Sequence, residues 1–67
     1  MKTQDRADIT NLLDHINECG RWVSHALNNA RGGSLKGTDL ALAELRMAVL
    51  DAQVLVAAMM DREKAER

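Results

Sequence analysis

The chain lacks most of the residues on which small independent domains rely. Its 67 residues include no Pro, no Phe and no Tyr, and only one Trp and one Cys. A lone cysteine excludes an internal disulfide and suits a reducing compartment. Together with two histidines it does not make up the ligand set of a structural zinc site. Because a core of this size supplies only roughly 3–5 kcal/mol, we expect the chain to be stabilised by self-association.

The sequence also lacks an excess of charge of either sign and any long apolar run. Its formal net charge is −1, whereas a protein that holds duplex nucleic acid needs a strong basic excess. The longest apolar run, 54–60, is far shorter than the ~20 residues that span a bilayer. The start, MKTQDRADIT, leads into no apolar region, so we expect no signal peptide and a cytoplasmic protein.

What the sequence does contain is helical periodicity. Apolar positions at alternating spacings of four and three residues indicate a packing seam along one side of a helix. One such seam consists of Ile9, Leu13, Ile16, Gly20, Val23, Leu27 and Ala30. A second consists of Leu42, Leu45, Val49, Ala52, Val56 and Met59. We therefore predict helices over about 5–31 and 39–63, with Gly20 allowing close helix approach in preference to a kink or a ligand slot.

The segment 32–38 is predicted to be the turn between these helices. Two glycines end the first helix, and Thr38 is a suitable N-cap for the second. A short turn between helices of similar length predicts an all-α, antiparallel two-helix hairpin as a single domain over 1–67. An additional apolar stripe, Leu40, Met47 and Val54, is left without a partner in a lone hairpin. We therefore expect a symmetric homo-oligomeric helical bundle.

No group of residues makes an evident catalytic or metal site. His15 and His25 are ten residues apart and do not share a helix face as paired ligands would. Glu44 and Asp51 lie two turns apart and are interpreted as surface charge. The turn sequence GGSLKGT differs from a nucleotide-binding P-loop, because its lysine precedes the glycine and a helix precedes the loop. We predict a protein that is not an enzyme and that holds no cofactor or metal.

A binding role is more compatible with these residues. Cations, donors and an aromatic ring that could bind a ligand gather on the first helix and at the turn: Arg21, Trp22, His25, Asn28, Arg31, Lys36 and Thr38. Arginine and lysine suit phosphates, and a tryptophan ring suits a base. Two structural alternatives remain open. Trp22 could simply fill a subunit interface, and the turn could be an ordinary polar turn with helix caps.

Part of the second helix resembles a known family. The stretches LALAELRMAV (40–49) and AQVLVA (52–57) resemble the second helix of the phage anti-CBASS and anti-Thoeris hairpin-domain proteins. Lys36 would occupy the basic position that precedes this helix in the family. Arg46 stands where an acidic residue is common, and Asp51 where an aromatic residue is common. The resemblance covers about 20 of the 67 residues, and the first helix adds only its seam and polar back.

The resemblance implies a function. Family members are phage-encoded oligomeric sponges that sequester immune-signalling nucleotides between protomers without cleaving them. The expected ligand is then a cyclic di- or trinucleotide or a cyclised ADP-ribose, captured in the cytoplasm of an infected bacterial host. The alternative interpretation is a small helical inhibitor or adaptor that targets a host protein. Neither interpretation requires a membrane or duplex nucleic acid.

Overall fold

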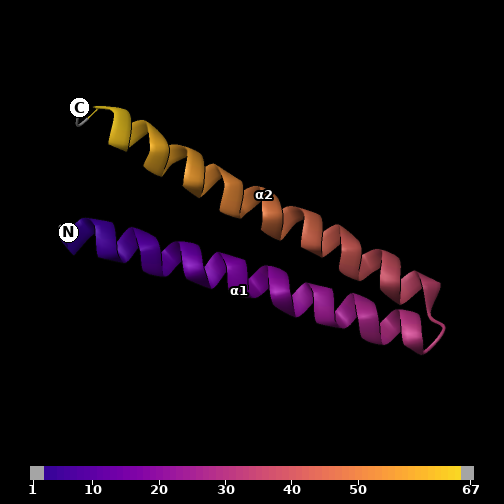
Figure 1. The fold of residues 1–67 in the computed structure, drawn as a ribbon. Coiled ribbons are helices and arrows are strands. Elements are labelled where there is room, and N and C mark those ends of the chain that lie inside the picture. Colours follow the sequence, from indigo (N-terminus) through magenta and orange to yellow (C-terminus); the bar gives the residue numbers. More distant parts are fainter. Residues whose placement is uncertain (1–2, 66–67) are drawn as a thin grey trace.

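Two long helices make up the part of the chain that the structure describes. The computed structural model describes residues 3–65, with side chains from residue 6 onward. Helix α1 is Thr3–Arg31 and helix α2 is Leu35–Ala65. They lie antiparallel, with the start of α1 and the end of α2 at one end of the hairpin and the turn at the other (Figure 1). The expected all-α hairpin is confirmed, whereas its assembly into an oligomer stays a prediction.

A Schellman motif ends α1. The amide of Ser34 donates to the carbonyl of Asn29 at 2.9 Å, and the amide of Gly33 donates to the carbonyl of Ala30 at 3.1 Å. Gly33 has a φ of 82°, in the left-handed region that glycine enters without steric cost. The second of the two glycines therefore permits the chain to reverse.

Helix α2 begins earlier than the sequence pattern predicts. The expected turn over 32–38 is shorter, because α2 starts at Leu35. Ser34, in place of the expected Thr38, is the N-cap: its Oγ accepts a hydrogen bond from the amide of Gly37 at 3.0 Å. Thr38 lies inside the helix, where its hydroxyl donates to the Ser34 carbonyl at 2.7 Å. A serine directly after the glycines thus caps the helix one turn before the threonine could.

The helices meet along a face that is displaced from the seam predicted for α1. Most α1 side chains of low exposure recur at spacings of four and three: Asp8, Leu12, His15, Cys19, Trp22, Ala26 and Asn29. Glu18 and, from the predicted seam, Ile9 are half-buried beside them. The recurring positions precede the predicted seam by one residue, which is about 100° of rotation on a helix. Leu13 and Ile16 of that seam are 54% and 51% exposed. The predicted α1 seam is therefore wrong as the contact face of the hairpin.

Helix α2 uses only half of its predicted seam. Its side chains of low exposure are Ala41, Leu45, Ala48, Ala52, Leu55 and Met59. Leu45, Ala52 and Met59 were expected to face α1. Leu42, Val49 and Val56 were expected there too, but they remain exposed. Ala41, Ala48 and Leu55 take their places, and the two alanines allow the helix backbones to approach closely.

The core of the hairpin is correspondingly small. The buried apolar residues in the described part of the chain are all alanines, Ala26, Ala41, Ala48 and Ala52, with between 4% and 9% of each exposed. No large side chain there is fully buried. Burying a methyl or methylene group contributes only about 0.8 kcal/mol, whereas a buried leucine or valine contributes roughly 1.5–3 kcal/mol. The hairpin alone thus leaves most of its apolar side chains in water.

The exposed apolar side chains lie mainly on one broad side of the hairpin. We call this side the broad apolar face. Ile16, Val49, Val56 and Met60 line a groove on it, and helical spacing places the exposed Leu13, Val23 and Leu27 of α1 and Leu42 of α2 on the same faces of their helices. This apolar groove of about 330 Å³ runs between the helices, and Cys19 also lines it. Leu40, Met47 and Val54 are exposed on the other flank of α2, as the sequence predicted for a lone hairpin.

The hairpin is narrower at the turn than at its open end (Figure 1). Near the turn the contact is made by very small residues such as Gly37 and Ala41, whereas the larger Met59 takes part near the open end. An ion pair between Arg62 of α2 and Asp8 of α1 joins the helices at this end. Side-chain size along the contact face thus accounts for the divergence of the two helices.

Two glycine substitutions test the close approach at the turn. An added Cβ at Gly20 would meet no heavy atom of the hairpin within 4 Å. Alanine there should therefore raise the free energy of unfolding by about 0.5–1 kcal/mol. An added Cβ at Gly37 would overlap the Asn29 carboxamide and lie 2.8 Å from the capping Oγ of Ser34. Gly37→Ala should therefore gain less stability than Gly20→Ala, or lose stability.

Urea unfolding followed by circular dichroism measures both changes against the unmodified protein. Equal gains at the two positions would contradict the tight packing between Gly37 and Asn29.

Candidate functional site

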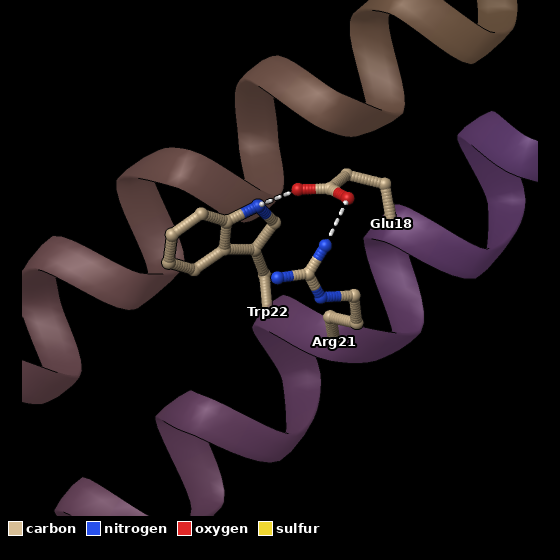
Figure 2. Close-up of polar contacts among 3 residues, drawn as sticks. All are labelled: Glu18, Arg21 and Trp22. Atoms are coloured by element: carbon tan, nitrogen blue, oxygen red, sulfur yellow. Dashed lines mark hydrogen bonds and ion pairs between the residues drawn. The ribbon is translucent and has the colours of Figure 1, made fainter.

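Trp22 belongs to the most connected side-chain cluster on α1. The indole is half-buried against α2, and its Nε1–H donates to Oε1 of Glu18 at 3.0 Å. Oε2 of the same carboxylate accepts from Nη1 of Arg21 at 3.0 Å, so Glu18 joins both side chains (Figure 2). Residues three and four apart on a helix are neighbours, which allows both bonds. One carboxylate thus orients the indole and pairs with the adjacent guanidinium.

His25 extends this cluster by one turn. Its ring centroid lies 5.2 Å from that of Trp22, with the two rings tilted by 50°. The backbone carbonyl of His25 accepts a hydrogen bond from the Asn29 side chain at 2.8 Å. Asn28 lies further along α1 and is exposed. Of the residues expected to bind a ligand, the structure therefore places Arg21, Trp22 and His25 together.

A groove of about 360 Å³ adjoins Trp22 on the side of the hairpin away from the broad apolar face. Its lining includes four carboxylates, two from each helix: Asp14, Glu18, Glu44 and Asp51. Trp22, Met47 and Ala48 provide its apolar part, and His15 completes the lining. Glu44 and Asp51, which the sequence analysis interpreted as surface charge, are therefore part of a groove that both helices line.

The charge of this groove determines which ligands suit it. Like charges repel, and the focusing of several carboxylates in one groove attracts cations and disfavours anions. Arg21 is the cation nearest to Trp22 among the expected ligand-binding residues, and its guanidinium already pairs with Glu18. A phosphate placed against the indole would thus face carboxylates from both helices. A cationic group would be attracted there.

The remaining expected residues lie at the turn. Arg31 and Lys36 are exposed, and Thr38 is half-buried with its hydroxyl bonded to the backbone. Arg31 is nine residues from Trp22, or roughly 13 Å along the helix at 1.5 Å per residue. Within one chain, the structure therefore divides the expected site in two. One part is the indole cluster on α1, and the other is a basic region at the turn.

Sequence reasoning missed the acidic groove because it treated each helix separately. Glu44 and Asp51 share one face of α2, and Asp14 and Glu18 lie four apart on α1. In an antiparallel hairpin, the middle of one helix lies beside the middle of the other. Aligning the two helices about the turn would have brought these pairs together. The sequence therefore shows how the carboxylates are spaced on each helix, but it does not show that the two pairs line the same groove.

No metal-binding group is found among the described residues. None of their His, Cys, Asp and Glu side chains form a group of three suited to a metal ion. The Ser34 hydroxyl is engaged in capping α2, and Cys19 is half-buried beside the apolar groove.

Comparison with known protein families, curated proteins and solved structures gives no match to this chain. Within residues 3–65, neither helix combines the length and the apolar character needed to cross a membrane.

Proposed function

We propose that this chain is a non-enzymatic binding protein that captures a basic, amphipathic helix of another protein in the groove beside Trp22. The observation that carries the proposal is the composition of that groove, in which four carboxylates surround Trp22, Met47 and Ala48. The carboxylates of such a groove can pair with lysine and arginine side chains, and its apolar residues can contact leucine or isoleucine side chains. The proposal corresponds to the inhibitor or adaptor interpretation of the sequence.

Helix-in-groove recognition provides the physical model. An amphipathic helix inserts its apolar side chains into a groove and places its charges along the rim. Tryptophan is often a dominant contact in such interfaces, because it buries a large surface with little loss of conformational entropy. Methionine adapts to irregular partners. Glu18 orients the indole in the free protein, which lowers the cost of ordering it on binding.

A second candidate function is capture of a signalling nucleotide at the turn. The observation that favours it is the separation of Arg31 and Lys36 from the carboxylates of the Trp22 groove. Two exposed cations beside the start of α2 suit phosphate groups, because a helix N-terminus also attracts anions. One hairpin presents only a narrow turn, so other protomers would have to complete such a site. This candidate corresponds to the sponge that the family resemblance implies.

The groove proposal predicts binding of a cationic helix. A synthetic amphipathic peptide, with lysines on one flank and leucines on the other, should change the fluorescence of Trp22, the only tryptophan of the chain. Glu44→Gln combined with Asp51→Asn should weaken this binding roughly two- to thirtyfold, because exposed charge pairs contribute about 0.2–1 kcal/mol each. Added salt should weaken it as well.

The matched control is Asp39→Asn combined with Glu63→Gln, which removes the same charge from exposed positions outside the groove. If both double variants weakened binding equally, the effect would come from the net charge of the protein and not from the carboxylates of the groove. Unchanged fluorescence across the peptide titration would argue against the groove as a helix-binding site.

The turn candidate predicts a thermal shift with nucleotides. A ligand at a hundredfold excess over its Kd should stabilise the folded protein by about 2.7 kcal/mol. Cyclic di- and trinucleotides and cyclised ADP-ribose are the compounds to test. Lys36→Ala and Arg31→Ala should each remove roughly 1–3 kcal/mol of binding free energy. Arg46→Ala, which removes an exposed cation away from the turn, should leave binding unchanged.

If none of these nucleotides shifts the unfolding temperature, the sponge interpretation fails. The groove proposal is unaffected by that result, because it uses different residues.

A further inference from the structure

We propose that the broad apolar face binds a second copy of this chain, so that two hairpins stack through it into a four-helix bundle with the two Trp22 grooves on its outer surfaces. The proposal is independent of what those grooves bind. It concerns a different face from the Leu40, Met47 and Val54 stripe, from which the sequence analysis inferred an oligomer.

The first argument is the mismatch between the buried and the exposed apolar side chains. The contact between α1 and α2 buries alanines, while Leu13, Ile16, Val23 and Leu27 of α1 remain exposed on the broad apolar face. These four positions belong to the seam that the sequence marks as the packing side of α1. A surface with this regular spacing normally packs against other helices. Two hairpins that share such a face would convert it into a core of large side chains.

The second argument is area. The molecule is a flat slab with extents of 51 × 17 × 10 Å. Its broad side therefore covers roughly 870 Å², close to the ~800 Å² that each partner buries in a standard stable interface. The broad apolar face is two helices wide and runs on α2 from Leu42 to Met60, so it takes up much of this side and approaches the area that a stable dimer needs.

The third argument is charge, and it selects a second copy as the occupant. The groove on the opposite side has four carboxylates, so two copies meeting through that side would repel each other. The side chains that line the apolar groove on the broad apolar face are all uncharged. Two identical faces can therefore meet without opposing like charges, as a two-fold symmetric interface requires.

The apolar groove provides a place for side chains of the second copy. It measures about 330 Å³ and is lined by Leu12, Ile16, Cys19, Val49, Val56 and Met60, with others. Large side chains of a facing helix could enter it, as ridges enter grooves in packed helices. Gly20 widens the approach on the α1 side, since nothing in the hairpin lies within 4 Å of where its Cβ would be.

Sedimentation equilibrium at micromolar concentration tests the proposal with a matched pair of double variants. Leu27→Glu with Leu42→Glu places charges on the broad apolar face, and Leu40→Glu with Val54→Glu places the same charges on the other flank of α2. The unmodified protein and the second variant should sediment as dimers or larger assemblies. The first variant should show at least a ~100-fold higher dissociation constant, because unpaired charges are costly to bury.

Cys19 gives a readout that does not depend on a variant folding correctly. It lines the apolar groove, so a second copy should cover it. In the unmodified protein, the thiol should react with a maleimide more slowly as protein concentration rises through the dissociation constant. Circular dichroism at each concentration shows whether the helices persist.

Three results would overturn the proposal. One is a folded monomer across the micromolar range, and another is equal dissociation of the two double variants. The third is a labelling rate for Cys19 that stays constant while sedimentation reports association.

Discussion

The most buried residues of the contact between α1 and α2 are alanines, and the rest of the structure depends on this constraint. Small side chains let the helices approach, with Ala26 on one side and Ala41, Ala48 and Ala52 on the other. Close approach leaves room for only a few larger side chains at the contact, such as Leu12, Leu45 and Leu55, and these are only half-buried. The other leucines and valines are therefore displaced onto the two broad sides and the back of α2. The close fit of small side chains determines how the two helices pack, but it buries little apolar surface.

The two broad sides differ in chemistry because each helix carries different residues on either side of the contact face. On one side, the exposed seam residues of α1 and the exposed Leu42, Val49 and Val56 of α2 form the broad apolar face. On the other, carboxylates from both helices surround Trp22 and Met47. The broad apolar face suits self-association. The opposite side, where carboxylates lie beside the Trp22 indole, suits a cationic partner. The proposed dimer and the proposed binding groove thus use opposite sides and do not compete.

The sequence predicted the helices well, because their periodicity and the glycines at the turn are local features. It placed the start of α2 late, because Thr38 and Ser34 are both good caps and only the Schellman geometry at Gly33 decides between them. It also assigned the largest side chains to the contact face. The pattern of apolar and polar residues marks the apolar side of a helix. Where that side is wide, the pattern does not show which part of it contacts the other helix of the hairpin. The hydrogen bonds from Arg21 and Trp22 to Glu18 could have been predicted, because these residues are three and four apart on one helix. Predicting the acidic groove would have required aligning the two helices with each other.

Small-angle X-ray scattering tests the central claim, that the hairpin is one layer of a two-layer bundle. A single hairpin has a Cα radius of gyration of 15.5 Å and a longest extent of 51 Å. Stacking a second layer about 8–10 Å away should double the scattering mass per particle while leaving the longest dimension close to that of one hairpin. Scattering from a particle of one chain mass, with the dimensions of the isolated hairpin, would contradict the account. So would a doubled mass with a nearly doubled length, because that result would indicate end-to-end association instead of stacking through the broad apolar face.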